Sequence, residues 1–416
     1  MKTLEGVGAI VADPSSLFCR VLLTEFEKRG QPAVLLNRWR YWDEGVPGNP
    51  PQVTTKEFEG TLGGRAVTAL SAALEFVLRA SPRWMRDLER EKAEGLPPMR
   101  PLLADAVSIG LAIRRLKPKF VFGQDIFLTG PSIAASAGVP RILMPFGGDI
   151  FHYSEISTAI HRMVGVSLRR ADLIVPSATS AVDRLVDEFH VPRSRVCAIS
   201  WGVDTNLFRP RSGEQRRALR ERYGIAHDAL VVMNLRRMQP FWGSDAIEEA
   251  FVRLAHTLPR FHAIVMSGSG DPGPVHALQA QIPERGTFIV QDVPLSDYAD
   301  LVAISDIGVS AMRVPDMRSW SILQAAAAGL IPILVDQPEY RAMERDGLRA
   351  IFFDHVDAGE IADAVTRCVD DEELRRKRGE QNRDFIVRRE SFDTQMDELV
   401  GRVVGLAEGR STRCAE

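Results

Sequence analysis

The sequence has few cysteines, and no apolar run in it is long enough to cross a membrane. The cysteines are Cys19, Cys197, Cys368 and Cys414. Their spacing matches neither a zinc site nor a redox motif, so we expect unpaired thiols in a reducing compartment. The longest apolar stretches, such as 102–113 and 321–335, contain polar residues or proline and are shorter than a membrane span. With no apolar core near the first residues, a secretory signal is not expected, and the prediction is a cytoplasmic protein.

The chain also lacks an excess of charge of either sign. Its 52 basic and 55 acidic residues give a formal net charge of −3. This balance excludes the basic footprint that binding to a phosphate backbone requires, so nucleic acid is not an expected partner. With 45% hydrophobic and 26% charged residues, the composition is that of a folded protein. A length of 416 residues predicts two domains.

Short apolar strands alternate with amphipathic helices along both halves of the chain. Predicted strands of the first half cover 7–12, 32–37, 120–122, 141–146 and 172–175. Those of the second half cover 229–235, 263–266, 288–290, 307–310, 331–335 and 351–353. The alternation predicts an α/β fold with two doubly wound, Rossmann-like parallel sheets. Ligands bind beyond the carboxyl ends of such strands, so two facing sheets would form an interdomain cleft.

The segment 315–331, with the sequence PDMRSWSILQAAAAGLI, is the most informative about a ligand. Asp316 lies in a predicted loop, and Gln324 lies one to two turns inside a helix that Ser319 or Ser321 could cap. Both side chains can then face one ligand. The backbone N–H groups of the first helical turn would suit a diphosphate leaving group. The alternative is an ordinary helix start with a buried amide.

Five motifs occur in an order that resembles family 4 of the glycosyltransferases. They are RRADLIVPSATSAVDRL at 169–185, ISWGVDTNLFRP at 199–210, and the segments 235–243, 265–270 and 316–324. This family comprises retaining enzymes with two facing Rossmann-like domains, the GT-B fold. The resemblance implies an acceptor domain at 1–205, a nucleotide-sugar donor domain at 206–389, and a C-terminal segment, 390–416, that packs back on the first domain.

The resemblance also implies a donor site in the second domain. Asp316 and Gln324 match the two acidic positions of the family, and the amide of Gln324 can accept a ribose hydrogen bond without charge assistance. Arg237 matches an arginine that binds the diphosphate, and Trp242 falls where relatives carry a lysine. Arg236 could replace the charge of that lysine. Trp242 could stack on a base or sugar ring, or pack against the helix that follows.

In the first domain the sequence FGGD at 146–149 falls where relatives carry a histidine-containing turn. Phe146 cannot act as that histidine. The resemblance implies that Gly147 and Gly148 allow close backbone approach and that Asp149 contacts sugar or acceptor hydroxyls, with a helix cap as the alternative for Asp149. Gly268 lies in a glycine turn that could admit a phosphate or a base, although such a turn alone is weak support.

No metal and no cofactor beyond the donor substrate are expected. His152 and His161 are not spaced as a metal pair on one helix face, and no Asp-x-Asp cluster occurs where a nucleotide-bound metal would lie. The insert at about 54–101 matches the family least, so we expect it to recognise the acceptor. Within it, Arg83, Arg86 and Arg90 would line one helical face, which predicts either a docking surface for anionic lipid at the inner membrane face or a solvated surface.

Three functions are compatible with these motifs. The first is a metal-independent, retaining transferase that moves a sugar from a nucleotide diphosphate sugar to a hydroxyl of a glycan, a lipid-linked or a small-molecule acceptor. In it, Asp316, Arg237 and Asp149 would be the catalytic groups, and the amides from Ser319 to Ile322 would bind the phosphates. The second is a related protein that has lost catalysis and acts as a binding subunit. The third is a sugar-nucleotide epimerase, for which the sequence offers no acid–base pair.

Overall fold

The computed structural model describes residues 6–12, 17–37, 52–54, 99–151, 158–267, 271–291, 293–314, 317–369 and 371–410. The chain divides into two compact units. The N-terminal unit consists of Met1–Ile199 with Asp397–Glu416, and the C-terminal unit of Ser200–Met396. The chain therefore passes between the units after residues 199 and 396, whereas the sequence predicted boundaries after residues 205 and 389.

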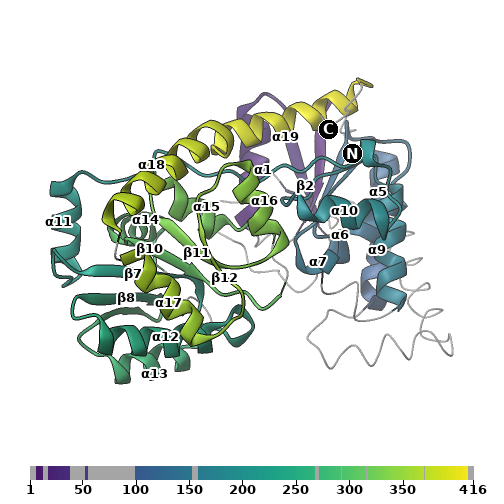
Figure 1. Ribbon diagram of the computed structural model, residues 1–416. Helices are drawn as coiled ribbons and strands as arrows, with labels where there is room; N and C mark the ends of the chain where they lie inside the picture. The colour runs from purple at the N-terminus through teal and green to yellow at the C-terminus, as the bar shows by residue number, and fades with distance from the viewer. Residues whose placement is uncertain are drawn as a thin grey trace. The chain divides into compact units, whose positions relative to one another are not determined.

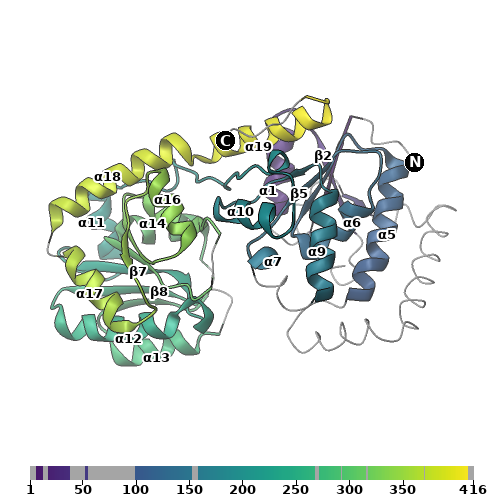
Figure 2. The ribbon, with the colours of Figure 1, turned by 45° about the vertical axis from the view of Figure 1, so that its right-hand side comes forward.

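The N-terminal unit contains a six-stranded parallel sheet in the order β3-β2-β1-β4-β5-β6. Its strands are β1 Gly8–Val11, β2 Ala33–Asn37, β3 Gln52–Thr54, β4 Val121–Gln124, β5 Arg141–Met144 and β6 Leu173–Ile174. Its helices are α1 Leu17–Lys28, α5 Met99–Leu116, α6 Ile126–Ala135, α7 Gly148–Phe151, α9 Thr158–Arg170, α10 Ser180–Asp187 and the 3-10 helix η2 Arg193–Arg195. All residues of β1 and β4 are buried, as expected for parallel strands covered on both faces. Helices α5, α6 and α9 lie side by side over this sheet (Figure 2).

The C-terminal unit contains a second six-stranded parallel sheet in the order β12-β11-β10-β7-β8-β9. Its strands are β7 Leu230–Arg237, β8 Phe261–Met266, β9 Gly286–Ile289, β10 Ile307–Ser310, β11 Ile331–Val335 and β12 Ile351–Phe353. Its helices are α11 Gly213–Arg222, η3 Pro240–Trp242, α12 Ser244–Thr257, α13 Gly273–Gln281, α14 Leu295–Ile304, α15 Trp320–Ala327, α16 Pro338–Asp346, α17 Ala358–Val369 and α18 Glu372–Arg389. Figure 1 shows these elements in teal, green and yellow.

The two sheets share one connectivity. In each, the first strand along the chain pairs with both the second and the fourth, so the direction of winding reverses between β1 and β4 and between β7 and β10. The prediction of two doubly wound α/β sheets is confirmed. In sheets of this kind a crevice forms outside the carboxyl ends of the strands at the reversal, which we call the switch point. The ends of β4 and β7 therefore identify where to look for a site.

The last helix, α19 Phe392–Ala407, begins in the C-terminal unit and ends in the N-terminal unit. Within the N-terminal unit, Arg29 Nε donates to Asp397 Oδ1 at 2.7 Å. Farther along, Lys119 Nζ lies 3.6 Å from Glu408 Oε1. These ion pairs hold the end of the chain against the N-terminal unit.

One cysteine prediction is wrong. Cys197 is disulfide-bonded, whereas Cys19 and Cys368 carry free, buried thiols. Sequence spacing could not show this, because disulfide formation depends on distance in the fold. Among the helices of the described residues, none combines the length and the apolarity that crossing a bilayer requires.

Candidate active site

The switch point of the C-terminal unit carries adjacent arginines at the end of β7. The backbone N–H of Arg236 donates to Asn234 Oδ1 at 3.0 Å, and its Nε donates to Ser310 Oγ at 3.4 Å. Ser310 is fully buried at the end of β10. Arg237, the last residue of β7, is exposed. One guanidinium is thus held across the switch point, and the side chain of the next residue is exposed.

Helix α15 packs against β7 and β10 and begins beside these strand ends. Ser319 is its N-cap residue but makes no capping hydrogen bond with its side chain; instead its Oγ lies 3.1 Å from Ser321 Oγ. Within the described chain, no acceptor takes the amide N–H groups of Ser321 and Ile322. Ile322 is fully buried, and the open amides of a helix start take water or a ligand as their partner. This turn can therefore bind an anion.

Gln324 lies one turn further into α15. The residue is 6% exposed, and its amide has no hydrogen-bond partner among the residues that the structure describes. The amide can therefore both donate a hydrogen bond to a bound ligand and accept one from it. The predicted partner of Gln324, Asp316, lies outside the described residues, as does Gly268. Their predicted roles stay predictions.

The loop after β7 fits closely against the loop after β10. Gly243 adopts φ +72°, and a Cβ on it would lie 2.1 Å from the carbonyl oxygen of Ala311. Arg313 Nη1 donates to Pro240 O at 2.6 Å. The Trp242 ring, whose centroid is 4.7 Å from that of Phe241, packs partly buried against the core of the unit. Trp242 therefore packs against the core, and its stacking on a base or sugar ring stays a prediction.

At the switch point of the N-terminal unit, Asp149 is buried, with 1% of the residue exposed. Its Oδ2 accepts hydrogen bonds from the amide N–H of Ile126 at 2.7 Å and from that of Phe146 at 3.0 Å. It thus joins the start of α6 to the loop after β5. Burial, followed by the nearby charge of Asp125, raises the pKa of Asp149 well above its ordinary value. Asp149 thus accepts the first amide hydrogen of α6, and its contact with a ligand hydroxyl stays a prediction.

Two further polar groups accompany Asp149. Gln124, the last residue of β4, is 3% exposed, and both its amide nitrogen and its amide oxygen lack a partner among the described residues, as does Asp149 Oδ1. Asp125 adopts φ +66° and accepts from the Leu128 N–H at 2.9 Å. Burial raises the pKa of Asp125 to about 6. The N-terminal switch point thus carries two carboxyl groups, Asp125 and Asp149, whose pKa values are raised.

The glycines of the FGGD turn lie at the start of α7. The carbonyl oxygen of Gly147 accepts the amide hydrogens of Ile150 and Phe151 at 3.2 and 2.8 Å. Gly148 is exposed. The turn therefore leaves backbone accessible at Gly148, beside the buried Asp149.

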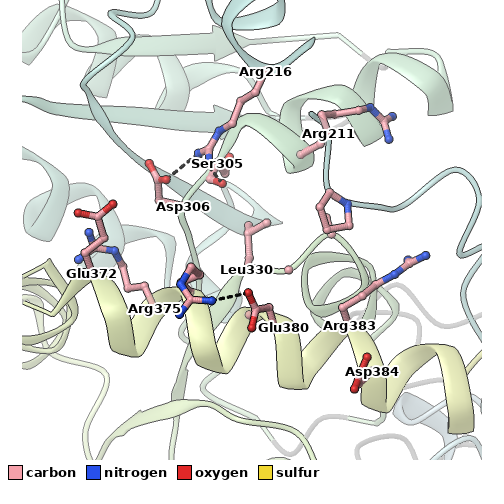
Figure 3. A pocket seen from close by; sticks show the side chains of 16 residues that line it. Arg211, Arg216, Ser305, Asp306, Leu330, Glu372, Arg375, Glu380, Arg383 and Asp384 are labelled. Atoms are coloured by element: carbon pink, nitrogen blue, oxygen red, sulfur yellow. Dashed lines mark hydrogen bonds and ion pairs between the residues drawn. The ribbon is translucent and has the colours of Figure 1, made fainter. Parts of the chain in front are cut away.

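A cavity of about 500 Å³ lies elsewhere in the C-terminal unit, at the amino edge of the sheet. Figure 3 shows α18 carrying Arg375 and Arg383 along its floor, with Arg216 above. These arginines donate to carbonyl oxygens at helix ends, from Arg216 to Ile304 at 3.0 Å, from Arg375 to Cys368 at 2.6 Å and from Arg383 to Ala327 at 3.0 Å. Helices of a parallel sheet end at this edge, and cations neutralise their C-termini. Helix capping explains this cavity, and the predicted donor residues lie at the other edge.

Two site residues were not predicted from the sequence. Ser310 ends a strand that was predicted at 307–310, and Gln124 follows the one predicted at 120–122. Polar residues at the carboxyl end of a predicted parallel strand, or within two residues of it, are the signal that could have found them. In the described residues, no three His, Cys, Asp or Glu side chains are grouped as metal ligands would be.

Residues 215–385 match the family described as glycosyl transferases group 1. Among curated proteins, the chain is similar to D-inositol 3-phosphate glycosyltransferases. That of Mycolicibacterium smegmatis is 26% identical over 216 residues, which cover 49% of this chain and 46% of the relative. That of Thermomonospora curvata is 29% identical over 225 residues, which cover 50% of this chain and 51% of the relative. The chain therefore spans about half the length of the curated relatives it matches.

Solved structures resemble almost the whole chain. A sucrose-phosphate synthase from Thermosynechococcus elongatus covers 97% of it with a TM-score of 0.69 at 13% identity, and all of that chain is matched. The Anabaena protein HepE in complex with UDP covers 96% with a TM-score of 0.67 at 13% identity, again over 100% of its own chain. At this level of identity the likeness establishes the fold, which is the GT-B type.

Proposed function

We propose that the protein is a retaining hexosyltransferase, because residues 215–385 match the family of group 1 glycosyl transferases and the chain has the GT-B fold. It takes a sugar from a nucleotide diphosphate sugar and passes it to a hydroxyl acceptor, without a metal ion. The single observation that carries this proposal is the combination of open amides at Ser321 and Ile322 with the arginines at the end of β7. Hydrogen-bond donors and positive charge meet where a diphosphate would gain negative charge as it leaves.

In this proposal each group has a defined task. Arg237, with Arg236, stabilises the departing diphosphate in place of a metal ion, since a guanidinium can bind two phosphate oxygens at once. The first turn of α15, from Ser319 to Ile322, binds phosphate oxygens through its amides. Gln324 accepts a hydrogen bond from the ribose, which satisfies its unpartnered amide. Asp316 orients the donor sugar. Trp242 lies in the loop after β7, which packs against the loop after β10.

The proposed donor rests on a similar solved structure, and the proposed acceptor rests on the curated relatives. HepE binds UDP, according to the description of its structure, so a uridine nucleotide is the first donor to test. The curated relatives carry an inositol phosphate in their names, which favours a small polyhydroxyl acceptor over a lipid-linked one. Asp149 and the Gly147–Gly148 turn belong to the proposed acceptor side. We further propose that the protein acts in glycan biosynthesis in the cytoplasm, either without a membrane or in contact with a membrane surface.

Calorimetric titration with UDP, ADP, GDP and their glucose conjugates, in the presence of a chelator, tests the donor site. We expect one base to bind selectively and the chelator to make no difference. Binding that requires a divalent cation would contradict metal independence. No binding by any nucleotide would contradict the donor site as a whole.

A protein that has lost catalysis and acts as a binding subunit is the second candidate. Specific residues favour it, because Phe146, Trp242 and Gln324 stand where a histidine, a lysine and an acidic residue were expected from the family resemblance. The two candidates differ in turnover. Release of UDP from UDP-glucose in the presence of an inositol phosphate supports the transferase, whereas tight nucleotide binding with no turnover for any acceptor supports the second candidate.

A further inference from the structure

Arg318 lies between the predicted sugar-binding Asp316 and the first turn of α15, and each of its side-chain nitrogens contacts a different carboxylate. Nε donates to Glu339 Oε1 at 3.2 Å, and Nη1 donates to Glu390 Oε1 at 2.6 Å. Nη2 pairs with Asp346. The side chains of Arg318 and Glu339 are 9% and 1% exposed. One guanidinium therefore fastens the loop before α15 to both ends of α16 and to the end of α18.

Glu390 extends this network to a distant part of the chain. Its Oε2 accepts from Ser200 Oγ at 2.5 Å, and its carbonyl oxygen accepts from the Val203 amide at 2.8 Å. The Phe392 amide donates in turn to the Val203 carbonyl oxygen at 2.8 Å. Residues 200–203 and 390–396 adjoin the places where the chain passes from one unit to the other. We call these residues the crossing segments.

A second contact joins the same two regions independently. Trp320, the first residue of α15, donates from its indole Nε1 to the carbonyl oxygen of Gly202 at 2.5 Å. Gly202 adopts φ +65°, and a Cβ there would lie 2.6 Å from the Cα of Phe392. The crossing segments therefore pack tightly against each other, and the start of α15 is anchored on them through both Arg318 and Trp320.

We propose that Arg318 is a positioning residue that fixes the first turn of α15 for phosphate binding and couples it to the crossing segments. The role of Arg318 in phosphate binding rests on the function proposed above, whereas its coupling to the crossing segments rests on the contacts alone. An arginine is needed because its planar guanidinium presents donors in three directions, whereas a lysine ammonium is a single compact charge. Burial raises the pKa of Glu390 and the Arg318 charge opposes that rise, so loss of the arginine leaves carboxylates crowded without a cation.

The test compares Arg318→Lys with Arg341→Lys. Arg341 also bridges two carboxylates, Asp336 and Glu344, but its side chain is 38% exposed on the outside of α16. Two readouts are taken for each variant, the Kd for UDP by calorimetry and the hydrogen exchange of the peptide 317–326, which includes the Leu323 amide bonded to the Ser319 carbonyl. We expect R318K to weaken UDP binding at least tenfold and to speed exchange in this peptide at least tenfold, and R341K to change neither.

A double variant separates positioning from simple loss of stability. Arg318→Met leaves three carboxylates together, and Glu390→Gln removes one negative charge while keeping an acceptor for Ser200. We expect R318M/E390Q to regain the thermal stability that R318M loses, while UDP affinity and slow exchange at 317–326 do not return. Recovery of affinity together with stability would overturn the proposal, as would R318K exchange that matches the wild type. If the wild-type protein binds none of the nucleotide diphosphates tested above, the donor proposal fails, and the exchange comparison alone decides the coupling.

Discussion

The two units have the same strand order, yet their switch points offer opposite chemistry. In the C-terminal unit the ends of β7 and β10 carry Arg236, Arg237 and the open amides of α15. In the N-terminal unit the ends of β4 and β5 carry Asp125 and Asp149, whose pKa values are raised. The fold thus determines where a ligand can bind, and the side chains at the strand ends determine its charge. The C-terminal switch point suits an anion, whereas the N-terminal one disfavours it.

The difference extends to how each site is held together. In the N-terminal unit, the carboxyl group of Asp149 accepts hydrogen bonds from the backbone N–H groups of Ile126 and Phe146. It therefore stabilises the protein in the absence of any ligand. The open amides of the C-terminal site gain partners only when something binds. Substitutions should therefore reduce stability at the first site and ligand affinity at the second.

The largest effect should follow Asp149→Ala. It leaves the buried amide of Ile126 and the part-buried amide of Phe146 without this acceptor, and each such group costs roughly 1–3 kcal/mol, so the N-terminal unit should lose about 3 kcal/mol of unfolding free energy. This loss of unfolding free energy is measured by urea denaturation, with hydrogen exchange of peptides from β4 and β5 as the probe of the N-terminal unit. Asp187→Ala, at an exposed position of α10, is the control. A fall in UDP release from UDP-glucose with an inositol phosphate acceptor, without loss of stability, would show that Asp149 is a ligand contact instead.

Arg237→Ala should have the next largest effect, on affinity. A charge-assisted hydrogen bond to phosphate contributes about 1.5–3 kcal/mol, so the Kd for UDP should rise more than tenfold while the unfolding midpoint stays unchanged. The matched control is Arg260→Ala, whose side chain is 70% exposed and pairs with Asp228 just before β8, at the other edge of the sheet. Calorimetry compares the two. Equal Kd values for both variants would remove Arg237 from the donor site.

The acidity of the N-terminal switch point predicts a dependence on pH. Burial raises the pKa of Asp125 from 3.8 to about 6, so the folded state holds this proton more tightly than the unfolded state. The resulting stability is complete below about pH 4 and is lost as pH rises through about 6. Asp125→Asn keeps the helix cap and removes the titration. Because Asp125 is partly exposed, the difference in unfolding free energy between wild type and D125N should change by about 1–2 kcal/mol from pH 4 to pH 7. A constant difference across this range would contradict the raised pKa.

The contrast between the sites was only partly predictable from the sequence. Local patterns were sufficient for the strands of both sheets except β3, which was not predicted, and for the first turn of α15, because side-chain periodicity and helix-start residues act over a few positions. Burial of Asp149 could not be read in this way, since a loop carboxylate looks the same whether exposed or buried. The contact of Arg318 with Glu390 joins residues 72 positions apart, and the disulfide of Cys197 likewise depends on distance in the fold. Long-range contacts of polar residues leave no periodic signal.

The smallest effect, and the one that probes the C-terminal site most finely, should follow Gln324→Glu. A carboxylate accepts a ribose hydrogen bond about twice as strongly as an amide, so UDP affinity should increase by about 1 kcal/mol, roughly fivefold in Kd. In the free protein the same charge is buried without a partner, so the unfolding temperature should fall and UDP should restore it. Calorimetry and thermal unfolding with and without UDP measure both effects. Gln281→Glu, on the exposed end of α13, controls for added charge. Weaker binding by Q324E would mean that the site requires the amide itself, because only an amide can also donate a hydrogen bond to the ligand.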